Sequence, residues 1–155
     1  MMPLTNILVP TDFSATAARA LDYGKALAET FRATLHVLFV MEDPFLTIPT
    51  LEGYTPLPRF REDMERDARR QLDQVLTPDE RARFHAQLVM VWGRPAVEIL
   101  EYAQTHGIDL IVMGTHGRGG LSHLLLGSVA EEVVRQASCP VLTVRAREPD
   151  VPPEG

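Results

Sequence analysis

The fold is decided by the stretch Leu110-Ile-Val-Met-Gly-Thr-His-Gly-Arg-Gly-Gly-Leu-Ser-His-Leu-Leu-Leu-Gly-Ser-Val129. It opens with an apolar run that is typical of a buried strand, continues as a glycine-rich turn, and ends where a helical pattern begins. Such a turn can direct several backbone N–H groups toward one point, and the helix N-terminus behind it adds about half a positive charge. The stretch therefore indicates an anion site, with phosphate as the first candidate.

Apolar runs of strand length recur along the chain. They are continuous rather than alternating, which is typical of strands buried on both faces of a parallel sheet. Pro10 is expected to end the first of them because it has no N–H to donate. The expected strands are residues 4–9, 35–40, 85–91, 109–113 and 140–145.

Helical periodicity fills the segments between these runs, at 14–32, 59–76, 94–106 and 128–137. Ser14 is expected to cap the first helix, and Thr77-Pro-Asp-Glu80 has the order of a capped short turn. The apolar stripes, which should face inward, include Phe31, Phe60 and Val134. The alternation of strands and helices predicts an α/β fold with right-handed crossovers, in which ligands bind at the carboxyl ends of the strands where the winding reverses.

Two segments depart from this alternation. Residues 41–58 contain four prolines together with several large apolar side chains, so they predict a long loop. That loop is either a lid that folds over something or a surface insertion. Residues 148–155 contain three prolines and are expected to be a disordered tail behind a single domain at 1–147.

Composition excludes several classes of function. The chain of 155 residues has 15 basic and 21 acidic side chains, a net charge of −6, and so lacks the basic footprint of a nucleic-acid-binding protein. No apolar run approaches the roughly 18 residues of a membrane span, and no export signal is visible, so a cytoplasmic protein is expected. The one cysteine, Cys139, excludes an internal disulfide and is read as a small buried apolar residue.

The glycine-rich stretch fails two common phosphate motifs. A dinucleotide fingerprint requires G-x-G-x-x-G directly after the first strand, where this chain has no glycine. A P-loop requires Lys and Ser or Thr after its second glycine, but Gly119 is followed by Gly120 and Leu121. The spacing that fits is G-x2-G-x9-G-[ST], at Gly114, Gly117, Gly127 and Ser128.

With this spacing, four segments resemble the universal stress protein family, in order and over nearly the whole chain. They are Val9-Pro-Thr-Asp-Phe-Ser14, Ile111-Val-Met-Gly-Thr-His-Gly117, Leu125-Leu-Gly-Ser-Val129 and Cys139-Pro-Val141. The resemblance implies a Rossmann-like sheet, of the adenine nucleotide alpha hydrolase-like type, with strand order 3-2-1-4-5. It also implies ATP binding in members that keep the loop, and a homodimer paired through the last strand, residues 140–145.

The resemblance also assigns the nucleoside end of an ATP site. Asp12 would hydrogen-bond the ribose, and Pro10 and Thr11 would line the adenosine side. Val40, at the end of the second strand, would present its backbone to adenine.

The phosphate end is assigned to the glycine-rich stretch and the helix behind it. Arg118 is the only fixed cation in the stretch, so a divalent ion, Mg²⁺ or Mn²⁺, is expected to accompany ATP. The residues that would surround the ribose and phosphates are Met113, Gly114, His116, Gly117, Gly127, Ser128 and Val129.

Simpler interpretations of three residue types stay open. Ser128-Val-Ala-Glu131 has the sequence of a capping box, so Ser128 could serve the helix alone. Asp12 could cap the first helix instead of holding a ribose. His116 and His123 could ligate a metal, although ligand contact or surface exposure fits them better because the stretch has no cysteine or paired carboxylate.

Three functions are therefore compared. The first is a nucleotide-binding regulatory protein of the stress response, with at most slow ATP hydrolysis and an unidentified downstream protein partner. The second is an enzyme, a weak ATPase or an adenylyl-transferring relative, for which the stretch supplies no carboxylate as general base. The third is a non-catalytic dimeric interaction or chaperone-like module.

Overall fold

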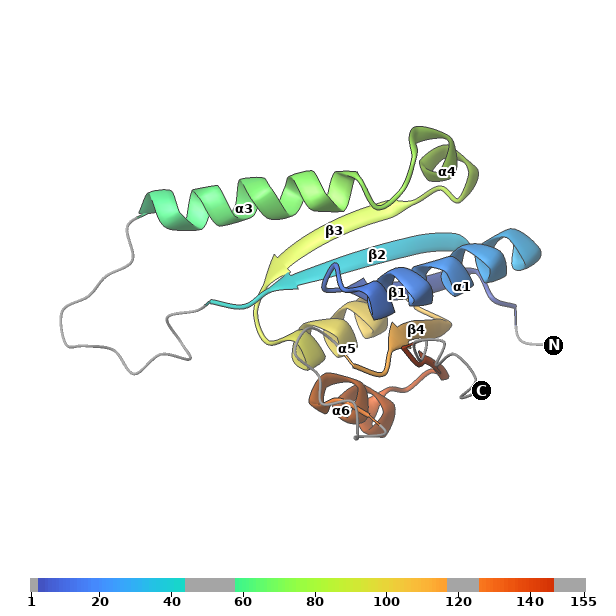
Figure 1. The fold of residues 1–155 in the computed structure, drawn as a ribbon. Helices are drawn as coiled ribbons and strands as arrows, with labels where there is room; N and C mark the ends of the chain where they lie inside the picture. The colour runs from blue at the N-terminus through green and yellow to red at the C-terminus, as the bar shows by residue number, and fades with distance from the viewer. Residues whose placement is uncertain (1–2, 44–57, 117–125, 147–155) are drawn as a thin grey trace, which may run out of the picture.

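The computed structural model describes residues 3–43, 58–116 and 126–146, which form a five-stranded sheet in the order β3-β2-β1-β4-β5. All neighbouring strands run parallel. The α/β class, the parallel sheet and the strand order implied by the family resemblance are confirmed (Figure 1). The strands are β1 (Asn6–Thr11), β2 (Thr34–Met41), β3 (Gln87–Trp92), β4 (Leu110–Gly114) and β5 (Val141–Val144).

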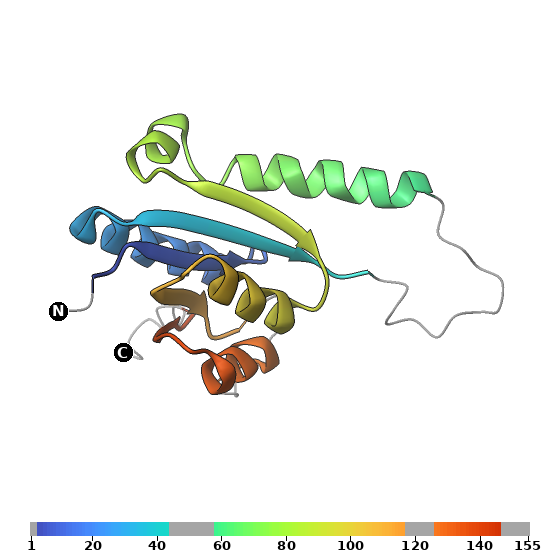
Figure 2. The same cartoon turned by 180° about the vertical axis from the view of Figure 1, so that it is seen from behind.

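Helices cover both faces of the sheet. Helix α1 lies in front of the sheet in Figure 1, and α5 lies in front of it in Figure 2, where the molecule is seen from behind. None of the helices in the described ranges is long and apolar enough to cross a membrane. The helices are α1 (Ala15–Phe31), α3 (Pro58–Asp73), α4 (Pro78–Arg83), α5 (Pro95–Thr105) and α6 (Ser128–Gln136).

Two expected irregular segments fall mainly outside the described residues. The loop expected at 41–58 is seen only at its ends, where β2 continues to Met41 and α3 begins at Pro58. Proline suits the first position of a helix, because its missing N–H would have no partner there. The tail expected at 148–155 lies entirely outside the described residues.

The continuous apolar runs are explained by two cores, one on each face of the sheet. Ile7 and Val9 of β1 face the core that α1 and α3 cover, whereas Leu8 faces the core that α5 and α6 cover. All three side chains have an exposed fraction of 0%. Because successive strand residues point to opposite faces, a strand buried on both sides must be apolar at every position.

Three expected inward-facing residues are exposed instead. The exposed fractions are 51% for Phe31, 45% for Phe60 and 44% for Val134. Phe31 is the last residue of α1, and Phe60 belongs to the first turn of α3, so both lie at helix ends. Helical periodicity gives the direction of a side chain but not whether a partner lies opposite it.

The prediction that Pro10 ends the first strand is wrong, because β1 continues to Thr11. Pro10 is in register with Leu38 of β2. The register between β1 and β4, however, covers only Ile7 and Leu8. Beyond Leu8, β1 has a paired neighbour on one side only, and proline is tolerated at such edge positions.

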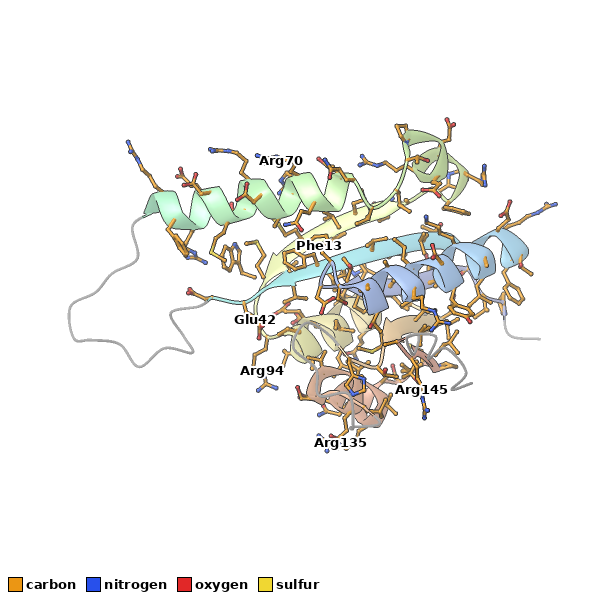
Figure 3. All side chains as sticks on the ribbon, viewed as in Figure 1. Phe13, Glu42, Arg70, Arg94, Arg135 and Arg145 are labelled. Carbon is orange, nitrogen blue, oxygen red and sulfur yellow. The ribbon has the colours of Figure 1, made fainter. Side chains whose placement is uncertain are left out.

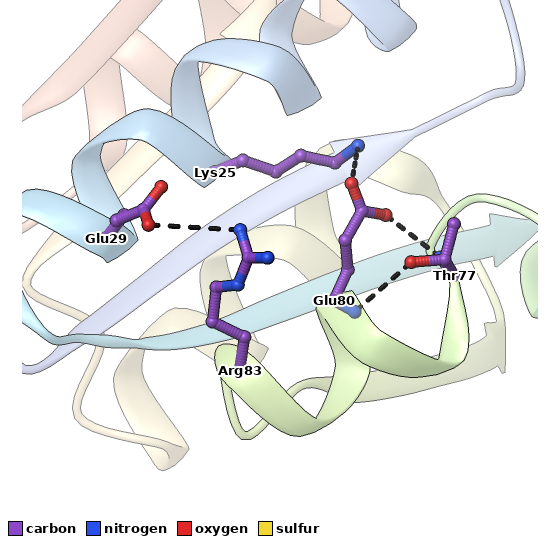
Figure 4. A network of polar contacts seen from close by, with 5 residues as sticks. All are labelled: Lys25, Glu29, Thr77, Glu80 and Arg83. Atoms are coloured by element: carbon purple, nitrogen blue, oxygen red, sulfur yellow. Dashed lines mark hydrogen bonds and ion pairs between the residues drawn. The ribbon is translucent and has the colours of Figure 1, made fainter.

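Helix α4 is tied to α1 by the polar contacts drawn in Figure 4. Thr77 and Glu80 form the complete capping box expected from the sequence, with Thr77 Oγ1 accepting from the Glu80 N–H at 3.2 Å. The Glu80 carboxylate also accepts from Lys25 Nζ of α1 at 2.9 Å. The backbone N–H of Thr77 and then Lys25 hold the pKa of Glu80 below its usual value.

A buried histidine joins β1, β2 and α5 near the amino ends of the strands. His36 Nδ1 lies 2.7 Å from the Tyr102 hydroxyl, and His36 Nε2 lies 3.0 Å from Asn6 Oδ1. His106 stacks on Tyr102 with ring centroids 3.7 Å apart. Burial, and then the charge of His106, lower the pKa of His36 from its ordinary value of 6.5.

We expect this network to make the protein less stable in mild acid. Between the lowered pKa of folded His36 and 6.5, the unfolded chain binds more protons than the folded one. The free energy of unfolding should therefore fall as pH drops below about 6.5. Urea unfolding at several pH values from about 7.5 downward measures this slope. His36→Gln should reduce the slope, and an unchanged slope in that variant would contradict the assignment.

Candidate functional site

A cleft of about 680 Å³ opens at the carboxyl ends of β1, β2 and β4, beside the N-terminus of α6. It lies where β1 and β4 stop pairing, the point at which the strand order reverses. Its volume is in the range of small-molecule sites. Of the residues expected to bind a nucleotide, it is lined by Pro10, Thr11, Asp12, Val40, Met113, Gly114, His116, Gly127, Ser128 and Val129.

The remaining expected residues, Gly117 and Arg118, lie outside the described residues, as does His123. The structure thus brings both ends of the glycine-rich stretch to the cleft together with the first strand end.

Three side chains build the turn that leads from β1 into α1. Thr11 Oγ1 accepts from the Phe13 N–H at 3.1 Å, and Asp12 Oδ1 accepts from the Ser14 N–H at 3.0 Å. Ser14 then caps α1, as expected, by accepting from the Ala17 N–H at 3.2 Å. The alternative in which Asp12 caps the first helix is therefore wrong: Asp12 holds the turn before the cap, with its carboxylate on the cleft wall.

Phe13 has a left-handed backbone, with φ of 63°. This conformation costs a non-glycine residue roughly 1–3 kcal/mol, so neighbouring contacts must hold it. The Phe13 ring packs on Phe39 of β2 with centroids 4.6 Å apart. Phe13 is labelled in Figure 3 at the start of α1. The sharp turn that it makes lets β1 end at the cleft while α1 returns along the sheet.

The two ends of the glycine-rich stretch are joined by a backbone hydrogen bond. The Gly127 N–H donates to the Thr115 carbonyl at 2.6 Å, and Thr115 is itself fixed to β5 through its N–H and the Val144 carbonyl, 2.9 Å apart. A Cβ on Gly127 would lie 3.0 Å from the Thr115 oxygen. Gly127 is thus needed for close approach of the chain to itself, whether or not a ligand is present.

Ser128 does not form the capping box that its sequence allows. The N-cap of α6 is Gly127, one residue earlier, which has no side chain with which to cap the helix. Ser128, Val129 and Ala130 instead form the first turn of a nine-residue helix beside the cleft. The first N–H groups of a helix have no intrahelical partner and carry partial positive charge, so this turn can bind an anion.

Comparison with known proteins agrees with this geometry. The profile of the universal stress protein family matches residues 3–145. The chain belongs to the universal stress protein family. Universal stress protein MJ0531 of Methanocaldococcus jannaschii is 37% identical over 140 residues, covering 90% of this chain and 81% of that protein.

Universal stress protein MJ0577 of the same organism is 34% identical over 154 residues, covering 91% of this chain and 94% of its own. Its solved structure matches with a TM-score of 0.75 at 27% identity, over 96% of this chain and 100% of that one. A universal stress protein of Archaeoglobus fulgidus, solved in complex with dAMP, matches with a TM-score of 0.62 over 92% of this chain and 99% of that one. At 21% identity, this last likeness concerns the fold alone.

His116 of this universal stress protein has one satisfied and one unsatisfied ring nitrogen. Nδ1 lies 3.0 Å from Thr115 Oγ1, whereas Nε2 is buried and has no hydrogen-bond partner among the residues that the structure describes. A buried polar atom without a partner costs about 1–3 kcal/mol, and such atoms need an explanation. His116 lines the cleft, so Nε2 is close to space that a ligand could enter.

No group of three or more His, Cys, Asp or Glu residues that could hold a metal ion occurs within the described ranges.

Sequence reasoning missed a whole wall of the cleft. Figure 3 labels Glu42, which follows β2 at the carboxyl end of the sheet and lines the cleft. Met64 and Gln71 of α3 also line it, although Met64 had the spacing of an ordinary core position. A strand-end rule could have found Met41 and Glu42. No local signal marks α3, because its place beside the cleft depends on packing between distant segments.

Gly114 is expected to be required by helix packing. A Cβ at position 114 would lie 2.7 Å from Thr16 Cγ2 in α1, and Gly114 does not have a left-handed backbone. Gly114→Ala should therefore destabilise the fold by about 1–3 kcal/mol, measured by urea unfolding. Thr16→Ser removes the clashing methyl group and should recover part of the loss in a double-mutant cycle.

Gly107→Ala is the matched control. Gly107 has φ of 60° and open space around its missing Cβ. Gly107→Ala should lower the free energy of unfolding by about 1–2 kcal/mol because of the left-handed backbone, and Thr16→Ser should not change this loss. If Thr16→Ser recovered none of the stability that Gly114→Ala loses, the packing role of Gly114 would be contradicted.

Proposed function

We propose that this universal stress protein binds ATP in the cleft and acts as a nucleotide-dependent regulatory protein of the stress response. The observation that carries the proposal is that the first turn of α6, whose N-cap is Gly127, lines the same cleft as the Asp12 carboxylate at the end of β1. A carboxylate suits ribose hydroxyls and a helix N-terminus suits phosphate, so the two ends of the cleft have the complementary chemistry of a nucleotide.

At the nucleoside end, Asp12 accepts hydrogen bonds from the ribose, with Pro10 and Thr11 beside the adenosine. Asp12 Oδ1 already accepts from the Ser14 N–H, which holds the carboxylate in place before a ligand arrives. Val40 ends on the cleft and offers its backbone to the adenine edge.

At the phosphate end, the N–H groups of the first turn of α6 and the Ser128 hydroxyl donate to phosphate oxygens. The buried Nε2 of His116 has no hydrogen-bond partner among the described residues, and an oxygen of the nucleotide supplies one. Met113, Gly114 and Gly127 bring backbone close to the ligand. Gly117 and Arg118 are assigned to the phosphates by the family resemblance, with Mg²⁺ or Mn²⁺ held by the phosphates.

The proposal has ATP held, or at most slowly hydrolysed. The carboxylates on the described wall of the cleft, Asp12 and Glu42, lie at the ends of β1 and β2 rather than at the α6 end. A general base must lie within hydrogen-bond reach of the water that it activates. Steady phosphate release well above background would favour the ATPase or adenylyl-transferring alternative instead.

ATP binding should stabilise the fold. At a hundredfold excess over its dissociation constant, a ligand raises the free energy of unfolding by about 2.7 kcal/mol. Isothermal titration and thermal unfolding measure the affinity and the shift. Asp12→Ala should weaken binding at least about tenfold through loss of a charged hydrogen-bond acceptor. Asp22→Asn, an exposed change on α1, is the control. Absence of binding at millimolar ATP would disprove the proposal.

The proposal also includes a homodimer that pairs through β5. This strand is paired with β4 on one side, and Leu142 on it has an exposed fraction of 39%. Beside it, a groove of about 250 Å³ is lined by Tyr23 of α1 and residues 142–145. An unpaired apolar edge is a template for pairing with another strand. A dimer without nucleotide binding would favour the non-catalytic interaction module.

Leu142→Lys should convert the protein from dimer to monomer, because a charge at the edge opposes strand pairing. Sedimentation equilibrium at micromolar concentration gives the mass. Val97→Lys on α5 is the matched control, since Val97 has a similar exposed fraction of 42% away from β5. A wild-type monomer, or a dimer unaffected by Leu142→Lys, would contradict this interface.

A cytoplasmic location and a downstream protein partner complete the proposal. ATP is abundant in the cytoplasm, and a single cysteine, Cys139, is kept reduced there.

A further inference from the structure

We propose that α3 is the outer wall of the nucleoside end of the cleft, and that Trp92 is the positioning residue that holds α3 there. This inference rests on the proposed nucleotide binding, because it assigns a role at the same site. Met64 and Gln71 of α3 line the cleft beside Met41 and Glu42 at the end of β2.

The hydrophobic core holds the half of α3 that contains Gln71 more firmly than the half that contains Met64. The buried residues of α3 are Ala68 and Leu72, with exposed fractions of 5% and 2%, and both belong to its second half. In the first half, Met64 is only half-buried. The first half of α3 therefore needs another anchor to keep Met64 on the cleft.

Trp92 provides this anchor with both parts of its side chain. Its Nε1–H donates to the Glu65 carboxylate, with Nε1 and Oε1 2.7 Å apart. The Arg61 guanidinium lies over its ring, 4.5 Å from the centroid. Arg61 and Glu65 are one helical turn apart and flank Met64 in the sequence. A hydrogen bond to a charged acceptor is stronger than one between neutral groups, and tryptophan is the aromatic residue that attracts a cation most strongly.

Trp92 is in turn fixed to the cleft itself. It is the last residue of β3, in register with Met41 of β2. The next residue, Gly93, donates its N–H to the Met41 carbonyl at 2.9 Å. The same backbone pairing thus places Met41 on the cleft wall and Trp92 under α3. The separation between β2 and α3, and so the width of the nucleoside end, depends on the Trp92 contacts.

The chemistry of this wall suits a nucleobase. The Met64 thioether is adaptable and polarisable and packs favourably on aromatic rings. The Gln71 amide can donate and accept hydrogen bonds. Both side chains lie on the α3 wall, whereas the phosphates are assigned to the α6 end of the cleft. A loosened α3 should therefore weaken binding of the nucleoside and leave the contribution of the phosphates unchanged.

The test measures dissociation constants for ATP and AMP by isothermal titration. Trp92→Phe keeps a ring under Arg61 but removes the donor, and Glu65→Gln removes the acceptor charge. Each should weaken ATP and AMP by the same factor, about fivefold, which corresponds to about 1 kcal/mol. Met64→Ala should do likewise. Glu62→Gln, an exposed change on the same helix, is the control and should bind as wild type does.

A second readout separates positioning from simple loss of stability. Trp92 is the only tryptophan in the chain, so its fluorescence reports on this contact alone. ATP should change the emission of the wild type, and the change should be smaller in Glu65→Gln. Lower thermal stability with unchanged dissociation constants and unchanged emission response would overturn the positioning role.

The outcomes separate the two proposals. If the wild type binds ATP and AMP while Trp92→Phe, Glu65→Gln and Met64→Ala bind as tightly, the role of α3 is wrong and the proposed function stands. If the wild type binds neither nucleotide, both proposals fail. A loss for ATP that is absent for AMP would also overturn the inference, because it would place the effect at the phosphates.

Discussion

The short pairing between β1 and β4 is the constraint on which the site depends. The two strands are in register only at Ile7 and Leu8, whereas β1 and β2 are paired along the whole of β1. Because the chain winds in opposite directions from these two strands, their following segments leave the sheet on different sides. The cleft lies beyond this pairing, and the turn at Asp12 and the first turn of α6 border it.

The fold was accessible from the sequence because its signals are repeated and mutually consistent. Continuous apolar runs gave the strands, and helical periodicity between them gave the helices and the α/β class. The strand order followed from the family resemblance rather than from any pattern. The errors have local causes. Pro10 stays in β1 because β1 pairs with β4 only at Ile7 and Leu8, and Phe31 and Phe60 are partly exposed because they lie at helix ends.

The sequence predicted only part of the cleft lining. Motifs mark positions where the backbone approaches something closely, but they do not say what it approaches. Gly114 approaches Thr16 of α1, and Gly127 approaches the Thr115 carbonyl, so both have a structural requirement in addition to the proposed one. The wall made by α3 has no motif, because Met64 and Trp92 meet the cleft through tertiary packing. Sequence patterns describe neighbours along the chain, whereas this wall depends on neighbours in space.

The Asp12 carboxylate has a structural role and a proposed role in binding. It holds the turn between β1 and α1 through the Ser14 N–H, and its position on the cleft gives it the proposed contact to ribose. Selection for folding alone would therefore favour a short polar side chain at position 12, even in a related protein that bound no nucleotide. If a relative keeps an aspartate or asparagine at this position, that residue alone is weak evidence that the relative binds a nucleotide. Beyond Gly127, whose N–H already donates to the Thr115 carbonyl, the first turn of α6 is the more informative place to look for divergence.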